Sequence, residues 1–466
     1  MERDARSIML GEMPMRQLVP KVSIPIMVSM LVQALYNVVD SIFVARYDPN
    51  ALTAVSLAYP IQMLMVSLCV GMGVGINSLI SRKLGERNYR AARTAAWNGV
   101  IVEFAGFVLF CLVGLFLARP AMTLFVSENL ADSEIIYEMS VTYLRIVTIW
   151  SLGSFGSIVF ERMLQSTGNA TLSMITQLAG AVVNIVLDPI MIFGYLGCPR
   201  MGIAGAAVAT VIAQHVSALI GFIFNQVSNK ELRLEWKDFG IDRGILKGIL
   251  AVGFPATVMQ AIGSVMNVTM NAMLSTFPEG NAAVNVLNVY FKLQSFVFMP
   301  VFGLGNGMVA VIAYNFGARK KERIYQALKV AWVWIAVILL LGTLLFQLCP
   351  AQLMSLFESG ENTSEITLAM TRLGVVALRI ISTHFLIASV GMTLNSFFQG
   401  VGKGTYSLII SLCRQLLVLL PAAWLLKQIF GTVGSVWWCF LVAEVVSGIL
   451  SVIFYRKCDR ELIAKL

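Results

Sequence analysis

Apolar runs long enough to cross a lipid bilayer recur along the whole chain, and they constrain its fold more than any other feature. A hydrocarbon core about 30 Å thick needs about 20 consecutive apolar residues in a helix. Hydrophobic residues make up 58% of the 466 residues and charged residues only 13%, whereas a soluble domain is about half apolar and about a quarter charged. The excess predicts an all-α integral membrane protein without a large soluble domain.

Twelve such runs predict twelve transmembrane helices and place both chain ends on one side. If the N-terminus lies inside, most of the 34 lysines and arginines fall in inner segments, and Arg46, Arg119, Arg200 and Lys427 fall in outer loops. Positive charge favours the cytoplasmic side, so we expect both termini in the cytoplasm and no nucleic-acid partner. The predicted spans are roughly 20–45, 53–80, 94–118, 138–161, 170–195, 203–226, 246–276, 282–312, 328–349, 366–394, 405–427 and 431–455.

The two halves of the sequence repeat each other. "GMGVGINSLISRKLGERN" (71–88) aligns without gaps on "GLGNGMVAVIAYNFGARK" (303–320), and "LQSTGNATLSMI" aligns on "FQGVGKGTYSLI". Six spans in each half are an even number, so the halves are parallel repeats that enter the membrane from the same side. We expect two pseudo-symmetric six-helix lobes, residues 1–228 and 229–466, which face each other across a cleft and expose it alternately to the two sides.

Two carboxylates interrupt the apolar spans of the first half at similar predicted depth. Asp40 lies in "YNVVDSIFVA" and Asp188 in "NIVLDPIMIFG". On a helix, Asn37 lies one turn from Asp40, and Asn184 lies one turn from Asp188. A carboxylate in hydrocarbon is costly, and such residues usually mark ion or substrate pathways. We therefore predict an oxygen-rich pocket in the first lobe that takes up H⁺ or Na⁺.

Pro189 adds to this prediction, because a proline inside a helix cannot donate a backbone hydrogen bond. It is expected to kink its span and to free a carbonyl oxygen beside Asp188. Desolvation favours the neutral form of a buried acid, and acids that share a pocket titrate together. The alternative is that each acid caps a loop or satisfies a kinked backbone. The second half has Met270 at the position of Asp40 and no acid beside Pro421, so ion coupling is expected in the first lobe.

Other polar side chains leave alternatives open. Lys292, near the midplane of its span, either lines the cleft or pairs with an acid such as Glu444. Glu103 and Glu444 are further proton sites or packing pairs, and Glu161, next to Arg162, is expected at the inner interface. The residues predicted to contact substrate are Gln33, Tyr36, Gln260, Asn267, Met270, Asn271 and Lys292.

Enzyme and metal motifs are missing from the sequence. Gly71, Gly73 and Gly75 lie inside a span without a following Gly-Lys-Ser/Thr, so they predict close helix packing rather than a phosphate loop. His215 and His384 are isolated and lack metal-ligand spacing. We therefore predict no enzymatic activity and no cofactor other than the coupling ion.

The quoted motifs resemble those of the multidrug and toxic compound extrusion (MATE) family, in its bacterial branch. The resemblance covers nearly the whole chain and also rests on "GIAGAAVAT" (202–210) and "VFMPVFGLGNGMVAVIAYNFGARKKER" (297–323). It implies the export of hydrophobic, often cationic drugs and dyes in exchange for inward H⁺ or Na⁺. By this resemblance, the cation site of the first lobe falls on Asp40, Asn184 and Asp188, with Thr210 as a fourth member.

The resemblance further implies a multi-pass protein of the cell (inner) membrane, working as a monomer without an ATPase subunit. Some branches carry acids in spans 7, 8 and 10, and this sequence has none there, which favours coupling in the first lobe. A lipid-linked oligosaccharide flippase of the same superfamily is an alternative, although several cleft-lining Arg or Lys would then be expected. A non-transporting membrane receptor or scaffold is a second alternative, which the duplication and the paired acids disfavour.

Overall fold

The computed structural model describes residues 7–126, 132–356 and 365–466, and its regular structure within these ranges is all helical. Ten helices are long and apolar enough to cross a membrane. Two bent helix pairs also qualify: Ser133–Ile149 with Leu152–Ser166, at 44°, and Met370–Ser382 with Phe385–Gly400, at 51°. Counting each pair as one span gives twelve, as the sequence predicts, so the chain is a multi-pass membrane protein.

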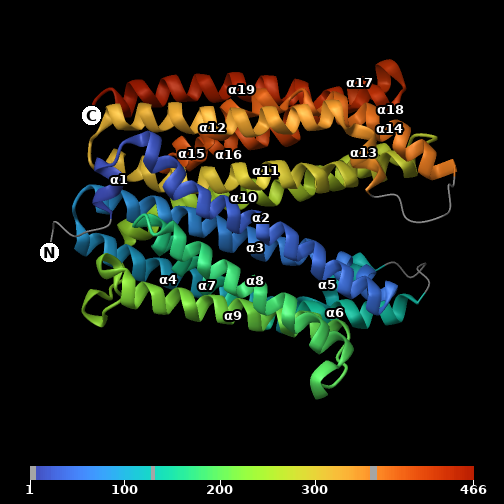
Figure 1. Cartoon of the computed structure of the whole chain (residues 1–466), viewed down its shortest axis with the longest axis horizontal. Coiled ribbons are helices and arrows are strands. Elements are labelled where there is room, and N and C mark those ends of the chain that lie inside the picture. Colours follow the sequence, from blue (N-terminus) through green and yellow to red (C-terminus); the bar gives the residue numbers. More distant parts are fainter. Residues whose placement is uncertain (1–6, 127–131, 357–364) are drawn as a thin grey trace.

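The first half of the chain forms one bundle, the N-lobe, in the lower part of the view in Figure 1. Its helices are long because a chain inside a bilayer must satisfy its backbone hydrogen bonds within each segment. A short helix, α1 (Ile8–Glu12), precedes this lobe. The helices of the N-lobe are α2 (Met15–Tyr47), α3 (Pro49–Gly85), α4 (Tyr89–Leu112), α5 (Ala118–Phe125), α6 (Ser133–Ile149), α7 (Leu152–Ser166), α8 (Ala170–Phe193) and α9 (Ile203–Ser228).

The second half forms the C-lobe, in the upper part of the same view (Figure 1). One of its spans contains a π-helical segment, η6 (Cys413–Leu419), which separates α16 from α17. The other elements are α10 (Arg243–Leu274), α11 (Gly280–Gly317), α12 (Lys321–Leu348), α13 (Pro350–Ser355), α14 (Glu365–Ser382), α15 (Phe385–Gly400), α16 (Gly404–Leu412), α17 (Leu420–Phe430), α18 (Val433–Val436) and α19 (Trp438–Cys458).

The segment between the lobes packs against α4 of the N-lobe. Asn98 is fully buried; its Nδ2 donates to Gly240 O (2.8 Å), and its Oδ1 accepts from the Asp242 backbone amide (3.2 Å). Trp97 Nε1 donates to Glu235 O (3.1 Å). These bonds hold the linker on the N-lobe up to the start of α10.

The backbone repeats the duplication that the sequence predicts. Arg87 and Arg319, at matched positions, both have positive φ, 57° and 55°. In each case the amide of the following residue donates to the carbonyl five residues before it. These bonds are Asn88 N to Lys83 O (3.0 Å) and Lys320 N to Asn315 O (2.9 Å). Gly168 and Gly402 form a second matched pair, with φ of 81° and 80°. These left-handed helix ends satisfy the last carbonyls of each helix, so the two lobes share local geometry as well as sequence.

The lobes meet near the end of the molecule where both chain termini lie, called the terminal end here (Figure 1). Two matched glycines make the closest approaches. A Cβ on Gly85 would lie 2.0 Å from the Tyr314 carbonyl oxygen, and a Cβ on Gly317 would lie 2.1 Å from the Arg82 carbonyl oxygen. A side chain of any size at these positions would push α3 and α11 apart.

Glycines in the middle of α3 make the same kind of contact with α10. A Cβ on Gly71 would lie 2.4 Å from the Thr257 amide nitrogen, and one on Gly75 would lie 2.2 Å from the Ile249 carbonyl oxygen. Gly73 instead faces the N-lobe helix α7, where a Cβ would meet Ile158 at 2.7 Å. The prediction that these three glycines serve close packing is therefore supported by their surroundings.

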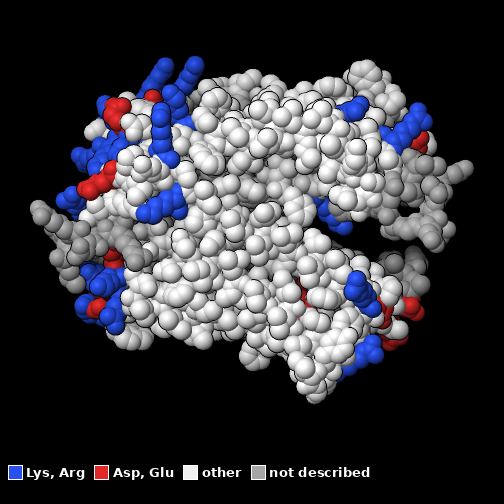
Figure 2. Space-filling view, viewed as in Figure 1, with Lys and Arg blue, Asp and Glu red and all other residues white. Residues whose placement is uncertain are grey.

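At the opposite, distal end the lobes separate, and Figure 2 shows a notch between them. Lysine and arginine gather at the terminal end in the same view (Figure 2). Ser78 Oγ donates to Gln399 O (2.6 Å) across the lobe boundary, and Asn315 Nδ2 on α11 donates to Leu10 O (2.9 Å). The molecule is thus joined at its terminal end and open at its distal end.

Candidate functional site

Asp40 and Asp188 lie together inside the N-lobe. Asp40 is on α2 and Asp188 on α8, and these two helices pack side by side. The two carboxyl groups lie close enough for the charge of each to act on the other. Asp188 is fully buried, and one carboxyl oxygen of Asp40 is also shielded from solvent. When two acids share one buried place, one of them stays protonated unless a cation lies between them.

Two further polar side chains complete this group, which we call the acid pocket: Asp40, Asp188, Asn184 and Thr210. Asn184 lies one turn before Asp188 on α8, and its Nδ2 donates to Asp188 Oδ1 (3.2 Å). The same nitrogen reaches Thr210 Oγ1 on α9 at 3.4 Å. Residues predicted from three separate spans are therefore brought into one place.

Three oxygens of the acid pocket have no hydrogen-bond donor. They are Asp40 Oδ1, Asp188 Oδ2 and Asn184 Oδ1, each buried and without a partner among the described residues. Unsatisfied buried acceptors are costly. A proton shared between the carboxyls would satisfy the two carboxyl oxygens, and a Na⁺ coordinated by oxygen could engage all three. Within the described ranges, the acid pocket included, no group of three or more His, Cys, Asp or Glu side chains is placed to hold a metal ion.

Two tyrosines border the acid pocket, and the sequence pointed to one of them. Tyr36, predicted to contact substrate, lies close enough to Asp40 and Asp188 for their charges to act on its hydroxyl. Tyr143 on α6 is buried and also lies close enough to both acids for their charges to act on its hydroxyl. Its hydroxyl lies 3.4 Å from Gln62 Oε1. Tyr143 carries no charge and stands in an apolar run, so its sequence context gave no sign of this position.

Other predicted members lie elsewhere. Asn37 is exposed on α2. Its backbone carbonyl accepts a hydrogen bond from Ser41 Oγ (2.9 Å), and its carboxamide is not part of the acid pocket. Gln33 and Lys292 are also exposed. The structure does not bring either of them into the acid pocket.

The substrate-contact residues predicted on α10 divide into two groups. Gln260, Asn267 and Asn271 are half-buried, and Asn271 Nδ2 donates to Asn267 Oδ1 (2.9 Å). Met270 is fully buried in the C-lobe core. Together with Met266, one turn earlier, it lies on the face of α10 that packs inward. Met270 therefore does not line an open surface, contrary to the prediction.

Pro189 lies inside α8, which continues through it to Phe193. A proline at this position has no N–H for the carbonyl of Ile185. The bond from residue 189 to this carbonyl is therefore absent, while the kink at Pro189 stays a prediction.

Glu161 and Arg162 are buried inside the N-lobe, at 2% and 3% exposure, rather than at the interface as the sequence suggested. Gln177 Nε2 donates to Glu161 Oε2 (2.5 Å), and Arg162 Nη1 donates to Gln165 Oε1 (2.7 Å). Gln165 in turn donates to Ser173 Oγ (2.9 Å). The bend between α6 and α7 turns this stretch into the bundle, which hydropathy along the sequence does not reveal.

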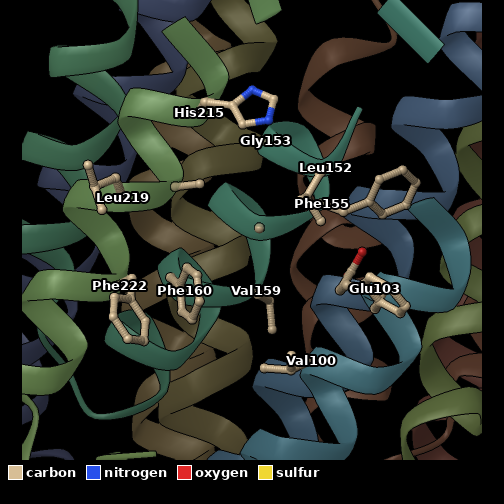
Figure 3. A pocket seen from close by; sticks show the side chains of 13 residues that line it. Val100, Glu103, Leu152, Gly153, Phe155, Val159, Phe160, His215, Leu219 and Phe222 are labelled. Carbon is tan, nitrogen blue, oxygen red and sulfur yellow. The ribbon is translucent and has the colours of Figure 1, made fainter. Parts of the chain in front are cut away.

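Glu103 borders a separate cavity of about 310 Å³ between α4, α7 and α9 (Figure 3). His215 is the other ionisable residue on its wall, and its Nδ1 donates to Val211 O (2.8 Å). Most of the lining is apolar, and Leu219 and Phe222 also face the outside of the molecule. Neither acid of the acid pocket lines this cavity, so it is distinct from that site.

A duplicated pair of helical bundles, joined at one end and holding a buried acidic group in one of them, is the architecture of a secondary transporter. Residues 25–190 and 255–425 match the MatE family. The chain belongs to this family, and it is a membrane transporter rather than an enzyme, as the resemblance implied.

Among curated proteins, the chain is 26% identical over 445 residues to the multidrug export protein MepA of Staphylococcus haemolyticus, covering 95% of this chain and 94% of that protein. It is 27% identical to MepA of Staphylococcus saprophyticus, with the same coverage of each chain.

Among solved structures, a MATE protein in complex with MaL6 has a TM-score of 0.90 at 26% identity, covering 98% of this chain and 99% of that one. A multidrug resistance MATE transporter in an outward-facing conformation has a TM-score of 0.88 at 26% identity, covering 98% of each chain. These matches confirm the predicted fold along nearly the whole chain.

Proposed function

We propose that this protein is a multidrug antiporter that exports hydrophobic, often cationic compounds in exchange for H⁺ or Na⁺ entering the acid pocket. The observation that carries the proposal is the group of three buried oxygens without donors on Asp40, Asn184 and Asp188. Similarity to proteins named as multidrug exporters supports the drug substrates. The lipid bilayer is the protein's environment, and we propose that it works as a monomer.

The orientation follows from the charge distribution. Lysine and arginine gather at the terminal end (Figure 2), and positive charge favours the cytoplasmic side. We therefore place both termini in the cytoplasm, which makes the open distal end the outer face. In this account residues 1–228 and 229–466 are the two units that move against each other, and the joined terminal end is the closed inner gate.

The cycle requires that the ion and the drug favour different states of the protein. An ion that neutralises Asp40 and Asp188 removes negative charge from the pocket, so a cationic drug loses attraction and leaves to the outside. Asn184, already bonded to Asp188, adjusts its hydrogen bonds to the new charge, and Pro189 allows α8 to follow. Only the difference in affinity between the two states can drive the change.

The direct test is efflux from reconstituted vesicles, with an imposed pH gradient in one series and an imposed Na⁺ gradient in the other. Ethidium is the probe, because it is a hydrophobic cation. We expect one of the two gradients to drive transport. If the rate of ethidium transport depended on neither gradient, the proposal would be contradicted. A flippase or a non-transporting protein would then be the better description.

A further inference from the structure

The short helix α1 (Ile8–Glu12) packs beside the C-lobe helix α11 at the terminal end, where the two lobes are joined (Figure 1). It has only five residues, and isolated helices shorter than about 12 residues are marginal in water. Leu10 in its middle is nevertheless fully buried. The surroundings of α1 therefore hold it in place.

The C-lobe holds the carboxyl end of α1 by hydrogen bonds. The last carbonyls of a helix have no partner within it, and cationic side chains are favoured at that end. Side chains on α11 and around the start of α12 supply the donors. The three bonds are Asn315 Nδ2 to Leu10 O (2.9 Å), Lys320 Nζ to Gly11 O (2.8 Å) and Arg323 Nη2 to Met13 O (2.7 Å).

The other end of α1 is attached to the N-lobe. The backbone amide of Ser7 donates to Glu231 Oε1 (2.9 Å). Glu231 lies in the 3₁₀ turn η4 (Lys230–Leu232), which packs against α4 and α9. The turn between α7 and α8 also contacts α1, since a Cβ on Gly168 would lie 3.0 Å from Met9 Cε. The five residues of α1 therefore span the boundary between the lobes.

The two attachments differ in what it costs to break them. Lys320 is exposed and Arg323 is half-buried, so water can replace their hydrogen bonds to α1 once the lobes begin to part. The N-lobe attachment includes apolar contact over Gly168, and α1 continues through Pro14 into α2. Movement of the lobes at this end should therefore separate α1 from the C-lobe and leave it on the N-lobe.

We propose that α1 is a latch on the inner gate, whose bonds to Asn315, Lys320 and Arg323 form when the terminal end closes and break when it opens. The latch adds to the close glycine contacts of α3 and α11, because it can be released bond by bond. Its strength then sets how often the inner side opens. This inference rests on the proposed transport function and concerns the control of its cycle.

The test joins α1 to the C-lobe by a reducible bis-maleimide spacer in E12C/K320C. Both positions are exposed, and Glu12 follows the residue that Lys320 contacts. The seven native cysteines are first replaced, and ethidium efflux of this parent is measured in vesicles. We expect the spacer to stop gradient-driven efflux and a reducing agent to restore it. The matched control is R93C/D238C, which joins α4 to the linker within the N-lobe across a pair at 3.1 Å and should keep its efflux when joined.

A second measurement does not depend on efflux. K320A/R323A should raise the rate at which a water-soluble reagent labels an introduced cysteine near Gly85, at least about tenfold, because charge-assisted hydrogen bonds of the closed state are lost. K321A, which changes the exposed neighbour of Lys320, should leave the rate unchanged.

Undiminished efflux from fully joined E12C/K320C would overturn the latch, and so would unchanged labelling in K320A/R323A. A parent protein that moves no ethidium under either gradient would count against the antiporter. The labelling result would still judge the latch in that case, so the two failures are distinguishable.

Discussion

The two lobes repeat each other in sequence, yet the charge of Asp40 and Asp188 in the N-lobe and that of Glu444 in the C-lobe are balanced in different ways. In the N-lobe, Asp40 and Asp188 lie together without a cationic side chain bonded to either among the described residues. In the C-lobe, Glu444 is paired with Arg414 at 3.3 Å. A buried acid without a fixed counter-charge binds a mobile one, whereas a buried ion pair is neutral already. In the proposed mechanism, ion exchange therefore takes place in the N-lobe and not in the C-lobe.

The largest effect is expected from the acids of the N-lobe. D188N or D40N should reduce gradient-driven ethidium efflux to the level seen without a gradient, because an amide cannot take up and release the ion. E138Q is the matched control, since Glu138 is an exposed carboxylate paired with Arg119 at 3.1 Å. Vesicle efflux at equal protein content measures the effect. If ethidium efflux by D188N still depended on the gradient, the contrast between the two lobes would be wrong.

The matched glycines at the terminal end should give the next largest effect. G85A and G317A each place a Cβ within about 2 Å of a carbonyl oxygen of the other lobe. Overpacking costs about 1–3 kcal/mol, which shifts an equilibrium between open and closed states about 5- to 150-fold. Both variants should therefore weaken closure of this end, to a similar degree.

Labelling of an introduced cysteine near Gly85 by a water-soluble reagent added from the terminal side measures this opening. G240A is the control, because a Cβ there meets nothing within 4 Å. Unchanged labelling in both glycine variants would show that these contacts do not close the gate.

A smaller effect on transport, read out as a loss of stability, should distinguish the C-lobe ion pair from the N-lobe acids. R414Q leaves the buried Glu444 carboxylate without its counter-charge. Because the Arg414 side chain is 34% exposed and the pair is partly screened, this should cost about 1–2 kcal/mol of stability, whereas R414Q/E444Q should cost much less. Thermal unfolding in detergent reports the difference as a lower midpoint for the single variant. Equal midpoints for the two variants would mean that the pair is already solvated.

The smallest effect concerns the linker, which is bonded to the N-lobe. N98A removes the buried carboxamide that bonds to Gly240 and Asp242, and should cost about 1–3 kcal/mol. R93A removes a partly exposed ion pair with Asp238 (3.1 Å) and should cost less than about 1 kcal/mol. Thermal midpoints compare the two. If R93A proved the more damaging, charge rather than the buried amide would hold the linker.

Much of this fold could be predicted because it follows from local patterns. Hydropathy locates the spans, and the fixed rise of a helix places Asp40 and Asp188 at similar depth. The glycine motifs predicted close packing, which Gly75 and Gly85 make between the lobes. These inferences need no knowledge of which helix lies beside which.

What could not be predicted depends on tertiary packing. The 44° bend between α6 and α7 accompanies the burial of Glu161, which hydropathy assigned to the interface. Glu444 pairs with Arg414 at 3.3 Å, and no local pattern in the sequence joins these two residues. Met270 aligns with Asp40 in the repeat but is buried in the core of its own lobe. Each of these outcomes depends on which face of a helix its neighbours cover.

The central claim is that Asp40 and Asp188 bind and release the coupling ion. It is tested most directly by recording H⁺ release and Na⁺ displacement when ethidium is added to the detergent-purified protein. The wild type should release one of the two ions in proportion to the drug bound, and D40N/D188N should release neither while remaining folded. Ion release from D40N/D188N equal to that of the wild type would contradict the account.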